Sequence, residues 1–395
     1  MTDGSHASNG LNGSTRGVLD DVRDWFARYI LTIDDDDLDI LTLWAAHTHV
    51  VEQTYSTPRL ILDSPVPGSG KTTVLEHLGR LCLQPLQAAS LSSPSLLTRM
   101  LNNAMRTVLI DEVDRTLNPK KEGVDELLAV INSGYKKGAT RPVLVPTKEG
   151  WDAVEMPTYS PIAMAGNAPN LPDDTRSRCI RVLLLPDHEG VIEPSDWEEI
   201  EEDAQALGLH LSAWAEGVRE HVRVVRPDLP ERCVARVKER WAPLARVASA
   251  AGGRWPDAAW HLIERDIAEA DADREDGAVT TPTPVQLLKD IYALWPSDRT
   301  FMETRTLLPA VIAHNPEMWG EYSTYGKALT VQRMGRMLVR AFKINSAQQP
   351  DGDRARGYLR TAFAPAWRRL GITPRPEPCG PFEPTEPSVT TSHAA

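Results

Sequence analysis

The residues best suited to chemistry in this sequence form a run of small and polar side chains, Ser64-Pro65-Val66-Pro67-Gly68-Ser69-Gly70-Lys71-Thr72-Thr73. The run follows an apolar stretch at residues 60–62 and precedes an amphipathic one, which is the setting that a phosphate-binding loop requires. Small residues let consecutive backbone N–H groups curl around a phosphate, and the positive end of a following helix adds to the attraction. The run therefore predicts a site for a nucleoside triphosphate.

The roles within this loop follow from its side chains. We assign nucleotide binding to Pro67, Gly68, Ser69, Gly70, Lys71, Thr72 and Thr73. Lys71 would reach the β- and γ-phosphates and the Thr72 hydroxyl would ligate Mg²⁺, so ATP and Mg²⁺ are the expected cofactors. Pro65 stands where such loops usually carry their first glycine, and its ring restricts the backbone at that turn.

Two carboxylates end a second apolar stretch, Val108-Leu109-Ile110-Asp111-Glu112. We expect Asp111 to lie near the Mg²⁺, and Glu112 to face the γ-phosphate and polarise an attacking water. A third apolar stretch, residues 162–165, leads into Gly166 and Asn167, whose amide would orient the same water. These residues predict hydrolysis of the bound triphosphate.

Arg176 and Arg178 precede the last apolar stretch, at residues 180–185. A planar, permanently charged guanidinium suits the stabilisation of a transferring phosphoryl group, so both are candidate arginine fingers for a neighbouring subunit's site. The alternative is surface ion pairing with the adjacent aspartates.

The elements that must position these residues alternate between strands and helices. Short apolar strands are expected at residues 60–62, 86–89, 108–110, 162–165 and 180–185, with amphipathic helices between them. This alternation indicates an α/β fold with a parallel sheet.

Composition divides the chain into six segments. We expect a disordered tail (1–16), an N-terminal helical segment (17–58), an ATPase core (59–186), a helical region (187–276), a further domain (285–372) after a linker at 277–284, and a Pro-rich disordered tail (373–395).

The order of phosphate loop, Asp-Glu strand, polar strand tip and late arginine resembles the AAA+ ATPases over residues 55–185. A closer resemblance, to the domain-of-unknown-function 3631 family, is carried by Leu43-Trp44-Ala45-Ala46-His47-Thr48-His49, Thr57-Pro58-Arg59-Leu60, Asn132-Ser133-Gly134-Tyr135-Lys136-Lys137-Gly138-Ala139, Trp241-Ala242-Pro243-Leu244, Gly252-Gly253-Arg254-Trp255-Pro256 and Arg356-Gly357-Tyr358.

This family resemblance implies a helicase-like module of phage, plasmid or integrated-element replication proteins. It also implies a ring, expected to be a hexamer, in which residues 187–276 form a helical lid. Arg178 falls where the family carries its arginine and is preferred to Arg176. Because this chain has no room for the primase-type domain that often accompanies the family, a separate primase is an expected partner.

A hairpin is the first candidate for contact with DNA. Residues 143–145 and 153–156 flank the turn Thr147-Lys148-Glu149-Gly150, which predicts two paired strands. Such a hairpin resembles the one that superfamily III helicases point into a central pore. Lys148 at the tip and Lys136 and Lys137 at the base are the predicted DNA contacts; the alternative is a solvated turn that completes the sheet.

A helix near the C-terminus is the second candidate. Thr330 can cap a helix with an apolar face formed by Val331, Met334, Met337, Leu338 and Ala341. Its other face carries Arg333, Arg336 and Arg340 at spacings of three and four. A two-stranded ribbon should follow, so this domain is predicted to be winged-helix-like, with the arginines in a DNA groove. The alternative is a solvated basic surface.

Composition excludes several other classes of protein. A net charge of −12 argues against non-specific coating of nucleic acid by the whole surface. The four cysteines form no CxxC pair, which argues against a disulfide framework or a zinc module. The N-terminus does not resemble a secretory signal, and the longest apolar runs are too short to cross a bilayer, so a cytoplasmic protein without membrane contact is expected.

Two further clusters of polar residues invite a metal interpretation. The acidic run Asp34–Asp37 is expected to be a solvated loop and helix cap. His47 and His49 point about 200° apart on a helix and cannot share an ion, so packing or backbone hydrogen bonds are expected there.

Together these observations predict an ATP-dependent, ring-forming motor acting on single-stranded or forked DNA, a replicative helicase or a helicase-like initiator. One alternative is a remodeller or loader that acts on a protein partner without unwinding DNA. Another is a nucleotide-gated DNA-binding module that does not hydrolyse ATP.

Overall fold

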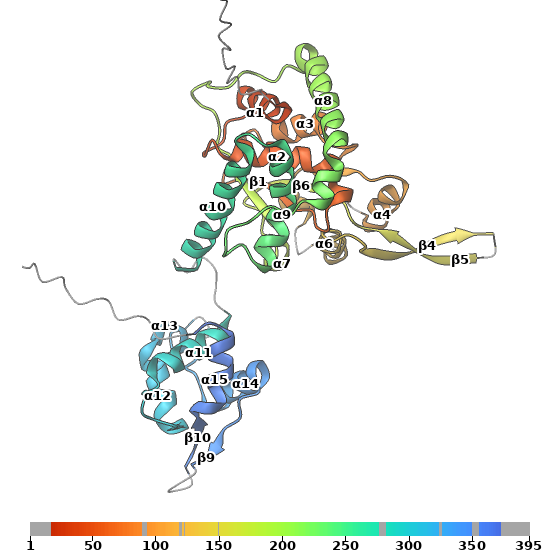
Figure 1. The fold of residues 1–395 in the computed structure, drawn as a ribbon. Coiled ribbons are helices and arrows are strands. Elements are labelled where there is room, and N and C mark those ends of the chain that lie inside the picture. Colours follow the sequence, from red (N-terminus) through yellow and green to blue (C-terminus); the bar gives the residue numbers. More distant parts are fainter. Residues whose placement is uncertain are drawn as a thin grey trace, which may run out of the picture. The chain divides into compact units, whose positions relative to one another are not determined.

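The computed structural model describes residues 17–88, 93–117, 121, 123–148, 150–275, 282–323, 326–349 and 355–372. The chain divides into two compact units, Met1–Ala272 and Asp273–Ala395, which are treated one at a time (Figure 1). The predicted tails, and residues 277–281 of the predicted linker, lie outside the described residues.

A five-stranded parallel sheet forms the centre of the first unit. Its strands are β1 (Arg59–Ser64), β2 (Pro85–Ala88), β3 (Thr107–Ile110), β6 (Ile162–Asn167) and β7 (Cys179–Leu183). They lie in the order β2-β3-β6-β1-β7, and each neighbouring pair is parallel. The predicted α/β class with a parallel sheet is thus confirmed.

Helices cover both faces of this sheet. They are α1 (Val18–Tyr29), α2 (Asp37–His49), α3 (Lys71–Leu81), α4 (Pro94–Asn103), α5 (Val113–Thr116), α6 (Val124–Ser133), α7 (Asp173–Arg176), α8 (Trp197–Val224), α9 (Ala235–Ala251) and α10 (Trp255–Glu275), with the short 3₁₀ helix η1 at Val51–Gln53. Ser93 caps α4 by accepting a hydrogen bond from the N–H of Leu96, as its position before Pro94 predicts.

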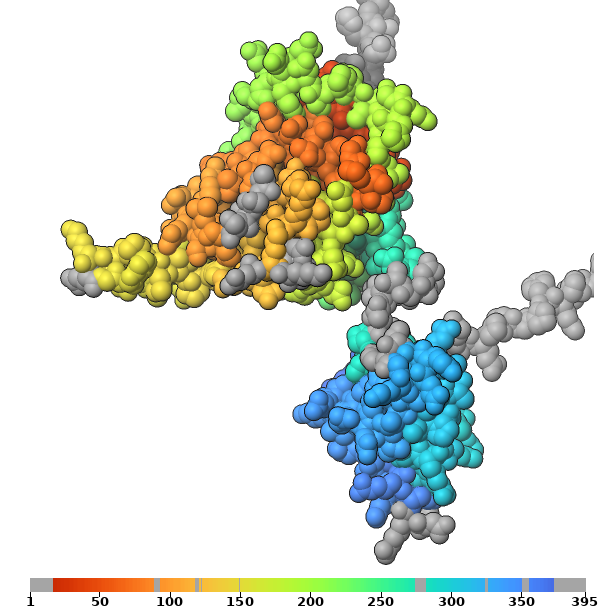
Figure 2. Space-filling view, turned by 180° about the vertical axis from the view of Figure 1, so that it is seen from behind, coloured from red at the N-terminus to blue at the C-terminus, as the bar shows by residue number. Residues whose placement is uncertain are grey.

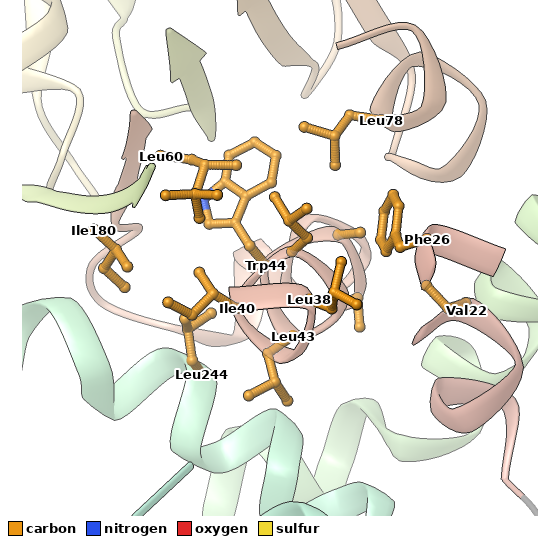
Figure 3. Packing of buried hydrophobic residues seen from close by; sticks show 14 of the residues in the cluster. Val22, Phe26, Leu38, Ile40, Leu43, Trp44, Leu60, Leu78, Ile180 and Leu244 are labelled. Carbon is orange, nitrogen blue, oxygen red and sulfur yellow. The ribbon is translucent and has the colours of Figure 1, made fainter. Parts of the chain in front are cut away.

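Alternation along β1 divides the interior into two cores. Leu60 and Leu62 pack with helices α1–α3 and α8–α10, whereas Ile61 packs on the opposite face with α4–α6. Helix α2 lies inside the larger core and is buried along its whole length. Figure 3 shows Trp44 of α2 beneath Leu60 of β1, and its indole N–H donates to the carbonyl of Pro58 at 2.9 Å.

The hairpin predicted between β3 and β6 is present. Strands β4 (Thr140–Thr147) and β5 (Gly150–Pro157) pair along their full length, with Thr147 opposite Gly150. The hairpin projects from the body of the unit, as Figures 1 and 2 show. Val143 and Met156 are buried towards its base.

The acidic run before α2 is more than the solvated loop that we expected. Arg265 of α10 pairs with Asp34 at 2.6 Å and also with Asp37, and Asp37 is only 5% exposed. Arg254 binds the neighbouring Asp39, also buried, at 2.6 Å. These arginines lie more than 200 residues further along the chain, so no local pattern could indicate the pairing.

The second unit combines helices with a small antiparallel sheet. Its helices are α11 (Thr283–Leu294), α12 (Thr304–His314), α13 (Pro316–Trp319), α14 (Val331–Phe342) and α15 (Arg360–Arg369). Strands β8 (Phe301–Glu303), β9 (Ala347–Gln348) and β10 (Arg356–Leu359) lie in the order β8-β10-β9. The core holds Trp319, Phe363 and Trp367, and the Trp319 indole donates to the buried Asp290 carboxylate at 2.6 Å.

The two histidines of α2 make the structural contacts that their spacing predicts. His47 Nε2 lies 3.1 Å from Thr57 Oγ1, and His49 Nε2 lies 2.8 Å from the Leu81 carbonyl. Among the described residues no group of three or more His, Cys, Asp or Glu could hold a metal ion. Burial lowers the pKa of His47 to about 3 and also lowers that of His49.

These buried histidines predict a loss of stability in mild acid. The unfolded chain binds a proton on each below pH about 6.5, and the folded chain excludes it, so stability falls as pH drops below that value. Between pH 7 and 5 the free energy of unfolding should fall by about 2 kcal/mol for each fully buried histidine. His47→Asn should reduce this loss by about that amount in denaturant titrations.

The exposed His188→Asn is the matched control and should leave the wild-type pH dependence. A pH dependence in His47→Asn equal to that of the wild type would show that His47 titrates freely in the folded chain.

Candidate nucleotide site

The loop between β1 and α3 turns at two glycines. Gly68 and Gly70 have φ of 73° and 79°, in the left-handed region where a side chain is strained. Pro65 stays outside that region, so the loop accommodates proline where a first glycine was expected. Gly70 directly precedes α3, whose first residue is Lys71, and the N-terminus of that helix faces the loop. Pro67 is exposed beside them.

Lys71 is held inside its own loop. Its Nζ donates to Ser69 Oγ at 2.8 Å and to the Val66 carbonyl at 3.3 Å, and the residue is 9% exposed. Burial lowers the pKa of Lys71, and the carboxylates of Asp111 and Asp63 partly oppose that shift. Hydrogen bonds from this buried ammonium group to charged phosphate oxygens would be stronger than its bonds to these two neutral acceptors.

Thr72 and Asp111 meet beside the loop, as the sequence predicts. Thr72 Oγ1 donates to Asp111 Oδ2 at 2.9 Å, which joins the first turn of α3 to the end of β3. Mg²⁺ is usually held by one or two protein oxygens together with substrate phosphates and waters. A hydroxyl and a carboxylate at this distance fit that pattern.

Glu112 adopts an unusual backbone conformation. Its φ is 49°, in the left-handed region, which costs a non-glycine residue about 1 kcal/mol or more. Its carboxylate pairs with Arg115 at 3.0 Å, and both side chains are more than half exposed. Such an exposed pair is weak, so the carboxylate can turn to another partner at little cost.

Asn167 ends strand β6, the neighbour of β1, and lies beside the start of the phosphate loop. It is paired with Ser64 in the register of β6 and β1, and it is exposed at the carboxyl edge. Its backbone N–H donates to Asp114 at 3.2 Å, and the next N–H, of Ala168, donates to Asp63 at 3.1 Å. Sequence analysis missed these two aspartates, although both lie at the end of a predicted strand or just beyond it.

Gly166 is required by close packing at this edge. A Cβ added to it would lie 2.8 Å from Val113 Cγ1 and 3.0 Å from Asp114 Oδ1, closer than atoms normally approach. A larger residue would therefore displace α5, which begins directly after Glu112.

A small cavity of about 170 Å³ opens beside the phosphate loop. Its walls include Gly68, Gly70 and Thr73 together with residues from two other segments, residues 29–31 and 184–192, which are Tyr29, Ile30, Leu31, Leu184, Leu185, Asp187 and Ile192. A cavity with both apolar and polar walls next to a phosphate loop suits the base of a nucleotide. No sequence motif indicated it, because the wall at residues 184–192 lies more than 100 residues beyond the loop.

The two candidate arginine fingers lie at the opposite edge of the sheet. The Arg178 carbonyl accepts a hydrogen bond from the N–H of Arg59, the first residue of β1, whereas Lys71 follows the last residue of that strand. Six strand residues span about 20 Å. Within one subunit, therefore, Arg178 does not reach the phosphate loop.

Arg178 is fixed, and Arg176 is exposed. The Arg178 guanidinium donates to the Asp174 carbonyl and lies 3.7 Å from the Asp174 carboxylate, and the side chain is 17% exposed. The exposed Arg176 donates to the Leu171 carbonyl at 3.1 Å. The ion pair that we weighed as an alternative role is thus present for Arg178, although at a loose distance.

Two of the three predicted lysine contacts for DNA are engaged within the chain. Lys136 pairs with Glu239 of α9 at 2.7 Å, and Lys137 donates to the Glu52 carbonyl at 2.6 Å. The reason is that their turn forms a bridge with residues Tyr55–Ser56, which brings both side chains onto the body. Lys148 is exposed at the hairpin tip, and so is Trp151, at 67%, which sequence analysis did not single out.

The predicted basic helix is α14, and Thr330 caps it by accepting from the N–H of Arg333 at 3.2 Å. Met334 and Leu338 are buried as predicted, but Val331 is 53% exposed. Arg336 and Arg340 are exposed and line a shallow hollow of about 600 Å³ with Gln332, Gly335 and Val339. Arg333 is partly buried, so the three arginines are not equally presented.

Comparisons with known proteins show which family the chain belongs to. Residues 187–370 match the family described as a protein of unknown function, DUF3631. A protein of Saccharopolyspora erythraea, described as an uncharacterized 28.9 kDa protein in the xis 5′ region, is 33% identical over 188 residues, or 46% of this chain and 67% of that protein. The chain therefore belongs to the same family as the Saccharopolyspora protein.

The DUF3631 match confirms the expected resemblance over part of its range. It includes the motifs at Trp241, Gly252 and Arg356 but begins after β7, so the phosphate loop lies outside it. No described helix is both long and apolar enough to cross a bilayer.

Replacing Lys71 tests the nucleotide site directly. Lys71→Ala removes a nearly buried charge from the loop and should weaken binding of ATP by about 10- to 100-fold, measured by calorimetry. The exposed Lys121→Ala is the matched control and should bind as the wild type does. Equal affinities for ATP in the wild type and Lys71→Ala would remove the assignment of this loop.

Proposed function

We propose that this chain is a Mg²⁺- and ATP-dependent DNA motor of the AAA+ class that assembles as a ring. The observation that carries the proposal is the Thr72–Asp111 hydrogen bond beside a glycine-rich loop, at the carboxyl edge of a parallel sheet. This edge is where open α/β sheets bind their ligands.

The proposed AAA+ assignment draws on the order of the strands. The loop strand β1 lies between β6 and the edge strand β7, and β6 separates it from the Asp-Glu strand β3. That arrangement leaves Asn167, at the tip of β6, between Ser64 and Asp111, where an amide can contact a water near the γ-phosphate. The cavity lined by Tyr29 and Leu184 would hold the adenine.

Each residue of the site has a defined part in hydrolysis. Lys71 would bind the β- and γ-phosphates, while Thr72 and Asp111 would hold Mg²⁺, which supplies positive charge to the phosphate oxygens. Glu112 would leave Arg115 and accept a proton from the attacking water, and Asn167 would orient that water.

Completion of the site requires a second copy of the chain. Because Arg178 lies at the amino edge of the sheet, it can reach a γ-phosphate only in a neighbouring subunit. Head-to-tail contacts of this kind close into rings, and we propose a hexamer.

The proposed biological setting is replication of a phage or other mobile element. The description of the Saccharopolyspora relative, which refers to the xis 5′ region, supports a setting in a mobile element. A replicative helicase or helicase-like initiator without its own primase domain would work with a separate primase.

A shared site makes a specific prediction for mixed rings. Arg178→Ala should bind ATP normally but hydrolyse it on the order of 10³-fold more slowly, which is the range for arginine fingers. Adding Glu112→Gln, which retains Arg178, should restore part of the ATPase activity, because some sites then combine an intact Glu112 with an intact Arg178.

Failure of every mixing ratio to restore activity would argue against a shared site. A loss of hydrolysis in Arg176→Ala, with Arg178→Ala unaffected, would move the finger to Arg176.

DNA contact is proposed at two places. The projecting hairpin presents Lys148 for phosphates and Trp151 for stacking on bases. The order of α14 and the β9–β10 ribbon supports a winged-helix-like second unit, in which Arg336 and Arg340 would face a groove of duplex DNA.

Single-stranded DNA distinguishes the proposed motor from its alternatives. We expect DNA to stimulate ATP hydrolysis, and Trp151→Ala to weaken binding of single strands by about tenfold or more in fluorescence anisotropy, since stacking contributes about 1–3 kcal/mol per base. Leu209→Ala, at an exposed apolar residue of α8, is the control.

Hydrolysis that is indifferent to DNA would favour a remodeller or loader of proteins. Nucleotide binding without turnover would favour a nucleotide-gated DNA-binding module.

A further inference from the structure

We propose that Tyr135 is the positioning residue for Arg178, and that it links the arginine finger to the base of the hairpin and to α9. The inference rests on the proposed function, since it describes how one subunit presents Arg178 to the ATP of the next. Nothing in the sequence motifs assigned a role to this tyrosine.

The ring of Tyr135 lies among three guanidinium groups. The Cζ atoms of Arg178 and Arg59 are each 5.9 Å from the ring centroid, and that of Arg236 is 5.6 Å away. At about 6 Å or less a cation is attracted by the face of an aromatic ring, more strongly where water is excluded. Tyr135 is 0% exposed, so these contacts are shielded.

The ring of Tyr135, not its hydroxyl, makes the contacts that matter here. Tyr135 Oη is buried and has no hydrogen-bond partner among the described residues. Burial raises the pKa of the phenol, so it stays neutral and forms no ion pair with the arginines. A phenylalanine could therefore supply the same surface, whereas an aliphatic residue could not.

Arg178 is held between this ring and α7. One guanidinium nitrogen donates to the Asp174 carbonyl, and Nε is buried without a hydrogen-bond partner among the described residues. The ion pair with the exposed Asp174 carboxylate is loose, at 3.7 Å. These contacts alone leave Arg178 poorly fixed, since an arginine has about 2 kcal/mol of rotamer entropy. The Tyr135 ring restricts it from a second side, and the side chain is 17% exposed.

Arg59 provides a second guanidinium group next to the Tyr135 ring. Its guanidinium is fully buried and donates to the Ile131 carbonyl at 3.1 Å and also to that of Ser160, and no described residue gives it a carboxylate partner. It holds a buried positive charge beside Tyr135, whereas the charge of Arg236 is paired with Glu239. Repulsion between the Arg59 and Arg178 guanidinium groups opposes a closer approach of Arg178 to the interior.

The same short turn leads into the hairpin. Tyr135 accepts at its carbonyl from the N–H of Thr57 at 3.0 Å, and β4 begins five residues later. The adjacent Lys136 pairs with Glu239, which also binds Arg236. A displacement of Arg178 by a neighbour's phosphate would thus be transmitted to α9 and the hairpin base through contacts already made.

Mixing variants in one ring distinguishes a role of Tyr135 in positioning Arg178 from a general role in packing. Tyr135→Leu should bind ATP as the wild type does but lower kcat by about 100-fold, the effect of a misplacement of about 1 Å. Tyr135→Phe should restore activity. Adding Glu112→Gln to Tyr135→Leu should rescue hydrolysis, because only the contribution in trans is defective, whereas adding Arg178→Ala should not.

The control is Tyr159→Leu, at another buried tyrosine, whose hydroxyl donates to the Val51 carbonyl. Tyr159→Leu loses packing but does not contact Arg178. Its ATPase activity should therefore be lowered to the same extent whether it is mixed with Glu112→Gln or with Arg178→Ala. Wild-type activity in Tyr135→Leu, or rescue by Arg178→Ala, would overturn the proposal.

Crystal structures of Tyr135→Phe and Tyr135→Leu test the positioning independently of turnover. The proposal requires Arg178 to stay over the ring in the first variant and to move in the second; an unmoved Arg178 in Tyr135→Leu contradicts it. An inactive wild type would refute the proposed ATPase function and leave this structural result in force.

Discussion

The parallel alignment of β1, β6 and β3 is the constraint on which the candidate site depends. Parallel strands end at one edge, so residues far apart in the sequence arrive together there: Ser64, Asn167 and Asp111. The hydrogen bond between Thr72 and Asp111 then fixes α3 against β3. Glu112 and Ala168, both at this edge, have left-handed backbone conformations. Strained residues of this kind cluster at functional sites in proteins.

Sequence could predict the parts of the molecule that depend on local pattern. The strands, the loop, the capped helices and the hairpin are all indicated by apolar periodicity and turn residues, and the structure contains them. The sequence also predicts the turns of the loop, since only glycine adopts the φ at Gly68 and Gly70 without strain.

Sequence could not predict contacts that the tertiary fold creates. The burial of Asp37 depends on Arg265, and the loss of Lys136 as a free surface cation depends on Glu239, each more than 100 residues away. The position of Arg178 against Tyr135 is of the same kind. In each case the residue types were visible, but their partners were set by how helices α9 and α10 and the sheet pack.

The continuous core around α2 limits how the first unit can move. Because α2 packs both against Leu60 of β1 and against Leu244 of α9, the helices after β7 share one interior with the sheet and are not a separately hinged cap (Figure 3). Opening a cleft between them would expose tryptophan and leucine side chains to water, at a cost of about 25 cal/mol per Å². In the proposed ring, the nucleotide-driven motion would therefore be a rotation of whole first units against one another.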